Sequence, residues 1–220
     1  MANLESLIIR LKITRALRSS RSEDAFRAVP RANFVPQELR DQAYEDYPLP
    51  IGFGATISQP TTVAFMLEKL DVRLGQKVLD IGSGSGWTTG LLSHLVGTKG
   101  RVTGLEIVSE LVTLGRKNME HLYSDILENI RIEMAPMPEI QLAKKGVVGL
   151  PEEAPFDRIL VSAAARKIPP ELIEQLKPDG ILIIPIGAEH AMQKIVRIRK
   201  TQGDTLTTEE YPGFVFVPLQ

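Results

Sequence analysis

The chain has 220 residues, 43% of them hydrophobic, and its 26 basic and 27 acidic residues nearly cancel. A chain of this length can bury a substantial core, and the balanced charge argues against a general attraction to nucleic acid or membranes. The absence of cysteine excludes disulfides, thiol nucleophiles and thiolate metal sites. The first residues do not resemble a signal peptide and no apolar run is long enough to span a membrane, so we expect a cytoplasmic monomer.

The N-terminal part of the chain, residues 1–70, is expected to carry helices and one long loop. Apolar residues recur at helical spacing from Leu4 to Leu11, and a second short helix is expected at Ser22–Ala28. Residues 43–60 combine proline, glycine and polar side chains without periodicity, which is typical of a functional loop. A helix is expected next, at Thr61–Leu70.

The centre of the chain reads as a strand, a tight turn and a helix. The apolar run that contains Asp80 stops at three glycines, Gly82, Gly84 and Gly86, and Thr88–Val96 then has the pattern of a helix. Glycine is required where the backbone has a positive φ or approaches a ligand closely. The second strand ends at Glu106, twenty residues after Gly86, where a carboxylate can accept hydrogen bonds from a nucleotide ribose.

The spacing of the glycines favours one nucleotide cofactor over another. Dinucleotide-binding turns follow the pattern G-x-G-x-x-G, whereas here the glycines alternate with Ser83 and Ser85, and Asp80 precedes them. A carboxylate at that place would repel a pyrophosphate and attract a cation. S-adenosylmethionine carries an ammonium, a sulfonium and a ribose but no phosphate, so the turn favours it over NAD. We therefore predict a cofactor site made by Asp80, Gly82, Ser83, Gly84, Gly86 and Glu106.

The remaining chain alternates strands and helices. A third strand is expected at residues 130–134, further strands at 158–163 and 181–186, and an antiparallel pair at 193–199 and 214–217. This order predicts a doubly wound, mainly parallel α/β sheet with helices on both faces. We expect a single domain over 1–220, with a cofactor-binding core at 71–190 and antiparallel strands at 191–220. The three histidines are scattered, so no metal site is predicted.

Several stretches together resemble the protein-L-isoaspartate O-methyltransferase family. They are Val29-Pro30-Arg31, Phe34-Val35-Pro36, Ala43-Tyr44-Glu45-Asp46, Thr56-Ile57-Ser58-Gln59-Pro60, the Gly82–Gly86 turn and the closing Phe216-Val217-Pro218-Leu219. The resemblance implies a Rossmann-like class I methyltransferase with added N- and C-terminal elements. It also implies transfer of a methyl group from S-adenosylmethionine to the free α-carboxylate of L-isoaspartyl residues in damaged proteins and peptides.

One segment departs from the family's pattern. The family's third strand ends in Gly-Asp-Gly, whose aspartate lies beside the adenine. Counting forward from Glu128 this chain offers Ala135-Pro136-Met137, and counting back from Glu153 it offers Lys144-Lys145-Gly146. Neither count finds the acid.

Ser58 is the residue that we place at the reacting centre. A substrate carboxylate is already ionised at neutral pH, so alignment and a dry pocket matter more than an acid/base pair. The resemblance implies that Thr56, Ile57 and Ser58 bind the substrate and that the Ser58 hydroxyl orients its carboxylate. The alternative is that Ser58 only caps the helix that begins near Pro60.

Two other functions stay open from the sequence. The chain could be a class I methyltransferase with a different, small-molecule substrate, or a non-catalytic relative that binds S-adenosylmethionine. Nucleic acid is disfavoured as a substrate because the chain lacks a basic footprint.

Overall fold

The computed structural model describes residues 2–129, 136–189 and 191–219. Its centre is a seven-stranded sheet with the strand order β5-β4-β3-β6-β7-β8-β9, which confirms the predicted fold class. The first five strands in this order run parallel, and β8 and β9 add to β7 in antiparallel fashion. The strands are β3 (Lys77–Ile81), β4 (Arg101–Glu106), β5 (Glu139–Leu142), β6 (Phe156–Val161), β7 (Leu176–Ile186), β8 (Gln193–Lys200) and β9 (Leu206–Phe214).

Both faces of the sheet are covered because successive residues of its strands point to opposite sides. Val78 belongs to a core cluster shared with the N-terminal helices, whereas Leu79 belongs to a second cluster on the other face. The helices that follow the N-terminal segment are α3 (Pro60–Leu70), α4 (Trp87–Val96), α5 (Ser109–Asn129), α6 (Pro170–Glu174) and the 3-10 turn η3 (Pro151–Glu153). Within the described residues no helix combines the length and the apolar character needed to cross a membrane.

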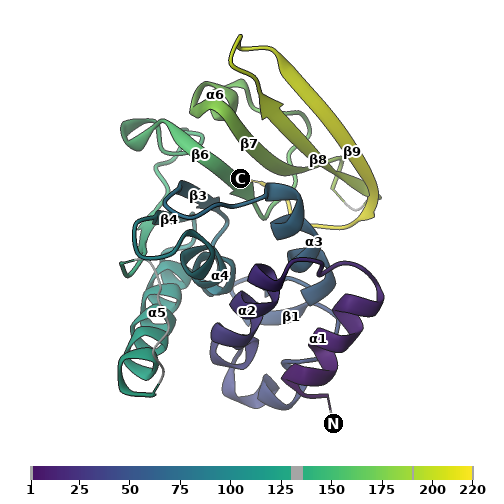
Figure 1. Ribbon diagram of the computed structural model, residues 1–220, viewed down its shortest axis with the longest axis vertical. Coiled ribbons are helices and arrows are strands. Elements are labelled where there is room, and N and C mark those ends of the chain that lie inside the picture. The colour runs from purple at the N-terminus through teal and green to yellow at the C-terminus, as the bar shows by residue number, and fades with distance from the viewer. Residues whose placement is uncertain (1, 130–135, 190, 220) are drawn as a thin grey trace.

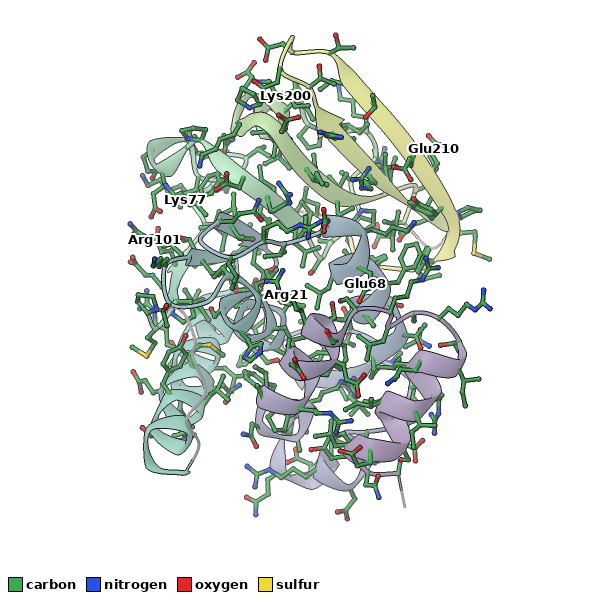
Figure 2. The ribbon with its side chains drawn as sticks, in the orientation of Figure 1. Arg21, Glu68, Lys77, Arg101, Lys200 and Glu210 are labelled. Atoms are coloured by element: carbon green, nitrogen blue, oxygen red, sulfur yellow. The ribbon has the colours of Figure 1, made fainter. Side chains whose placement is uncertain are left out.

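The N-terminal segment forms a separate layer beside α3 and α4. It contains α1 (Leu4–Ile13), α2 (Ser20–Ala28), and the 3-10 turns η1 (Arg31–Phe34) and η2 (Gln37–Gln42). The layer lies at the opposite end of the molecule from β9 (Figure 1). Two polar side chains secure its junction with the core, where Figure 2 labels them. Glu68 accepts hydrogen bonds from the backbone of Arg18 and Ser19, and the Arg21 guanidinium donates to the carbonyl oxygens of Val72 and Leu95.

Two predicted elements differ in the structure, and a third lies outside the described residues. The long loop at 43–60 contains a short hairpin, β1 (Leu49–Gly52) with β2 (Ala55–Ile57), which turns through residues of positive φ at Gly52, Phe53 and Gly54. The strand that pairs with β4 is Glu139–Leu142, whereas the predicted third strand at 130–134 lies outside the described residues. The last strand is predicted at 214–217, but β9 ends at Phe214. It pairs with β8 over its whole length, from Leu206 opposite Lys200 to Phe214 opposite Gln193.

Helix α4 packs so closely on the N-terminal segment that Gly90 has no room for a side chain. A Cβ atom there would lie 2.9 Å from Val29 Cγ1 and 3.2 Å from Met119 Cε. We expect Gly90→Ala to lower the free energy of unfolding, because overpacking costs about 1–3 kcal/mol and exceeds the gain of about 1 kcal/mol in helix propensity. Urea denaturation measures the change, with Gly203→Ala, which meets no atom within 4 Å, as the control. Equal or higher stability of Gly90→Ala would contradict the tight packing.

Candidate active site

A cavity of about 940 Å³ opens at the carboxyl ends of β3, β4 and β6. The strand order reverses at β3, and such switch points are where open α/β sheets bind ligands. The walls of the cavity come from five stretches of chain that lie far apart in the sequence. They are residues 53–58, residues 81–88, residues 105–111, residues 142–149 and residues 217–219, with Ser162, Ala163 and Glu189 between them.

The glycine turn is shaped by bonds within the protein. Gly82, Gly84 and Gly86 all have positive φ. The N–H groups of Gly82 and Ser83 donate to the Leu105 carbonyl at 2.8 and 3.0 Å, and the Gly86 N–H donates to Ser83 O at 2.8 Å. Because these amides are already occupied, the turn offers a ligand close backbone approach rather than the ring of free N–H donors that cradles phosphates.

Glu106 stands at the end of β4, 7% exposed, with its carboxylate against the turn. Its Oε2 accepts from Gly84 N at 2.9 Å, and its Oε1 accepts from Ile107 N at 2.7 Å and Val108 N at 3.1 Å. A carboxylate has about four acceptor sites, so the three backbone bonds fix its orientation and leave capacity for a ligand hydroxyl.

Asp80 lies behind the turn rather than on the cavity wall. It is fully buried, and its Oδ2 accepts from the hydroxyls of Thr88 at 2.7 Å and Thr89 at 2.6 Å. Its Oδ1 has no partner among the described residues. Burial, and to a lesser extent the nearby Glu106, raise the pKa of Asp80 to about 6, although the two threonine hydrogen bonds lower it. Asp80 therefore holds the start of α4 from behind the turn, and both Asp80 and Gly86 lie outside the residues that line the cavity.

The stretch Thr56-Ile57-Ser58 reaches the same cavity from the β1–β2 hairpin. The hairpin itself lies against the glycine turn, since a Cβ added at Gly84 would lie 3.3 Å from Cδ1 of Ile51, a residue of β1. The Ser58 hydroxyl has no hydrogen-bond partner among the described residues. The fold thus brings the predicted substrate residues over the predicted cofactor turn.

Ser58 does not cap α3. The helix begins at Pro60 after Gln59, and no side-chain bond from the N-cap residue closes it. Asp46 does that work instead, with Oδ1 accepting from Thr61 N at 2.9 Å and Oδ2 accepting from Thr61 Oγ1 at 2.6 Å. This geometry argues against the alternative that Ser58 only caps the helix.

Arg31, which has no role assigned from the sequence, holds the stretch Thr56-Ile57-Ser58 in place. It is 1% exposed, and its guanidinium donates to backbone carbonyl oxygens before and after the hairpin. Its acceptors are Ala43 O at 2.9 Å, Glu45 O at 3.4 Å, Tyr47 O at 3.0 Å, Ile57 O at 3.3 Å and Ser58 O at 3.1 Å. Its Cζ also lies 5.4 Å from the ring centre of Trp87, the first residue of α4. Burial lowers the pKa of Arg31 to about 10, which leaves it charged at neutral pH.

The residues present fit S-adenosylmethionine. Glu106 can accept from a ribose, the glycine turn admits a ligand at close range, and Ser83, on the cavity wall, has a buried Oγ without a partner among the described residues. The volume lies within the range of small-molecule sites. Among the described residues, no group of three or more histidine or carboxylate side chains is placed to hold a metal ion.

The family model for protein-L-isoaspartate(D-aspartate) O-methyltransferase matches residues 2–220. The chain belongs to this family. It is 43% identical over 98% of its length to a protein-L-isoaspartate O-methyltransferase of Methanopyrus kandleri, covering 90% of that protein. It is 41% identical over 96% of its length to the Thermococcus onnurineus enzyme of the same name, again covering 90%.

A solved structure of the family has the same fold. The Plasmodium falciparum protein described as a putative protein-L-isoaspartate O-methyltransferase superposes with a TM-score of 0.85 at 27% identity, over 100% of this chain and 99% of that one. That protein was crystallised in complex with S-adenosyl-L-homocysteine. Family membership and the shared fold confirm the resemblance inferred from the motifs.

The segment that departs from the family's pattern lies on the cavity wall. Lys144, Lys145 and Gly146 follow β5 directly, so the count back from Glu153 is the one that the fold follows. The sequence alone did not show where the third strand ends, since the forward and backward counts gave different residues. The pairing of β5 with β4, from Thr103 opposite Glu139, resolves the register.

The raised pKa of Asp80 predicts a pH dependence of stability. Its folded pKa of about 6 exceeds the ordinary 3.8, so between these values the folded state binds more protons than the unfolded one, and stability falls as pH rises. We expect the free energy of unfolding of the wild type, relative to Asp80→Asn, to fall by about 1–3 kcal/mol from pH 4 to pH 6 and to stay level above. Urea denaturation of both proteins between pH 4 and 7 measures this. Parallel curves would show that Asp80 does not titrate there.

The hydrogen bonds from Arg31 to the carbonyl groups around the hairpin predict that replacing Arg31 lowers turnover, whereas replacing a buried arginine far from the cavity does not. Lysine cannot span carbonyl oxygens on both sides of the hairpin, and each unpaired buried group costs about 1–3 kcal/mol. We expect Arg31→Lys to lower both the free energy of unfolding and the turnover per folded molecule. The matched control is Arg158→Lys, because Arg158 is also buried and donates to carbonyls of Asp71 and Asp157 far from the cavity. It should lower stability alone, and an equal loss of turnover in both variants would contradict a special role for Arg31.

Proposed function

We propose that this chain transfers a methyl group from S-adenosylmethionine to the free carboxylate of L-isoaspartyl residues in damaged proteins and peptides. The observation that carries the proposal is that Ser58 lines the same cavity as Glu106 and the glycine turn, with a hydroxyl that has no hydrogen-bond partner among the described residues. Membership of the family and the shared names of its relatives support the same activity.

The cofactor half of the site is assigned to the sheet. Glu106 accepts from the ribose hydroxyls, while Gly82, Ser83 and Gly84 let the amino-acid portion approach the backbone. Asp80 and Gly86 act from behind, by charge and by shaping the turn. When bound, S-adenosylmethionine supplies a methyl group on a sulfonium, a good leaving group that becomes a neutral thioether.

The substrate half is assigned to Thr56, Ile57 and Ser58. The Ser58 hydroxyl donates to one oxygen of the substrate carboxylate, which leaves the other oxygen aimed at the methyl carbon. The new O–C bond forms as the C–S bond breaks, and no proton has to move. The protein's contribution is therefore alignment and exclusion of water.

A different acceptor remains the second candidate, namely a small molecule taken up in the same cavity. The apolar side chains of Phe53 and Val217, exposed by 62% and 44% at the cavity, favour a peptide, because they offer surface beyond what a small acceptor would cover. An isoaspartyl peptide assay with S-adenosylmethionine, beside the matching aspartyl peptide, tests the choice. Ester formation confined to the isoaspartyl peptide is expected, and methylation of neither would reject the function.

The composition supports a peptide partner and a cytoplasmic location for the activity. A net charge of −1 suits peptide rather than nucleic acid partners, and a chain without cysteine suits the cytoplasm. The active species is assigned as a monomer, since the residues given to both halves of the site come from one chain. Residues 1–70 carry Ser58, residues 71–190 carry the cofactor residues and residues 191–220 complete the sheet, so the chain acts as one methyltransferase domain.

The role of Ser58 predicts a separation of turnover from stability. Ser58→Ala should leave affinity for S-adenosylhomocysteine within about threefold, and should slow ester formation about ten- to a thousandfold, matching the loss of one orienting hydrogen bond. The melting temperature should not change, because Asp46 caps α3. Calorimetry, turnover and thermal denaturation on one preparation measure all three.

The matched variant is Ser58→Thr, which keeps the hydroxyl and should retain part of the activity. Normal turnover in Ser58→Ala would sink the assignment of Ser58, while loss of cofactor binding would move Ser58 to the cofactor half of the site.

A further inference from the structure

The base of the cofactor has only one part of the cavity left to occupy. Ser58 and the glycine turn both line the cavity, and Ile51 of the hairpin lies 3.3 Å from a Cβ added at Gly84, so the proposed function places the transferable methyl group between the hairpin and the turn. Glu106 marks the ribose. Beyond Glu106 the wall consists of Ile107, Val108 and Leu111 on one side and residues 142–149, which follow β5, on the other.

This wall offers flat apolar surface and basic charge. Ile107, Leu142 and Val147 are 42%, 51% and 40% exposed although apolar, and all three line the cavity, as expected for residues that pack against a ring. The charged residues of the segment 142–149 are Lys144 and Lys145, and the segment contains no carboxylate.

The two lysines are not equivalent. The Lys144 ammonium donates to Glu152 Oε1 at 2.5 Å and is held in that ion pair. The Lys145 ammonium has neither a hydrogen-bond nor an ion-pair partner in the described part of the chain. Lys145 is thus the charged donor that the base can engage.

The position of Lys145 is fixed by the backbone around it. The Val147 N–H donates to Lys144 O at 3.1 Å and closes a turn in which Gly146 has a φ of 78°. The far end is anchored by the buried amide of Gln175, whose Oε1 accepts from Leu150 N at 2.7 Å and whose Nε2 donates to Val148 O at 2.8 Å. The segment is therefore a built wall of the cavity.

We propose that Lys145 determines which purine the cofactor site accepts, and that the site takes a 6-oxo purine at least as well as adenine. An ammonium only donates hydrogen bonds. On the edge that carries N7, adenine shows an acceptor beside a donor amino group, whereas a 6-oxo purine shows two acceptors, the pattern that lysine recognises. A carboxylate at the same place would favour the amino group of adenine. The inference rests on the proposed use of S-adenosylmethionine.

Calorimetric titration with S-adenosylhomocysteine and S-inosylhomocysteine tests the proposal. These compounds differ only at position 6 of the purine and its adjacent ring proton. For the wild type, S-inosylhomocysteine should bind as tightly as S-adenosylhomocysteine or up to tenfold more tightly. In Lys145→Asp the ratio of dissociation constants should shift at least tenfold toward S-adenosylhomocysteine. Lys144→Ala, which removes the paired lysine, should leave the ratio within threefold of the wild type.

A wild-type preference for S-adenosylhomocysteine of more than threefold would overturn the proposal, as would a ratio that Lys145→Asp does not move. Ester formation on an isoaspartyl peptide, measured on the same preparations with S-adenosylmethionine, separates this failure from failure of the proposed function. Methylation with an adenine-selective site rejects only the role of Lys145. Absence of both binding and methylation rejects the two together.

Discussion

The buried guanidinium of Arg31 is the constraint on which the two halves of the site depend. The sheet makes a cofactor turn on its own, but the stretch that carries Ser58 belongs to a proline- and glycine-rich segment with little regular structure. Such a segment loses much conformational entropy when it is ordered. Arg31 offsets that cost by gathering carbonyl groups from both sides of the hairpin, and it lies against Trp87 at the start of α4. One side chain thus joins the substrate stretch to the cofactor turn.

The sheet and the place of the glycine turn and Glu106 beside the cavity could be predicted from the sequence because their signals are local. The apolar run before Asp80, the alternating glycines and the acid after the second strand each occupy consecutive residues, and the βαβ unit leaves little choice in how they assemble. Asp80 shows the limit of this reasoning. The pattern identified an acid near the turn, but its side-chain direction depends on Thr88 and Thr89 reaching back from α4, which spacing does not reveal.

The remaining features depend on contacts between distant parts of the chain. Arg31 could not be assigned a role because its partners are backbone carbonyls, which every residue possesses. The strand that pairs with β4 could not be located from the sequence because residues 130–134 alternate as well as Glu139–Leu142 does, and the pairing of Glu139–Leu142 with β4 becomes visible only in the fold. The prediction at 130–134 lies outside the described residues. The place of Lys144 and Lys145 on the cavity wall likewise follows from the pairing of β5 with β4.

Asp46, rather than Ser58, caps α3. The stability of the helix therefore does not depend on the side chain at position 58, where the reaction is proposed to take place. Were Ser58 itself the cap, any change there would weaken the fold, and quality control in the cell would remove the product. Because the Ser58 hydroxyl makes no hydrogen bond among the described residues, a copy that lost the hydroxyl would, under the proposed role of Ser58, persist as a folded but slow protein that still binds damaged peptides. Drift at this position would therefore yield a competitor of the repair process rather than a misfolded chain.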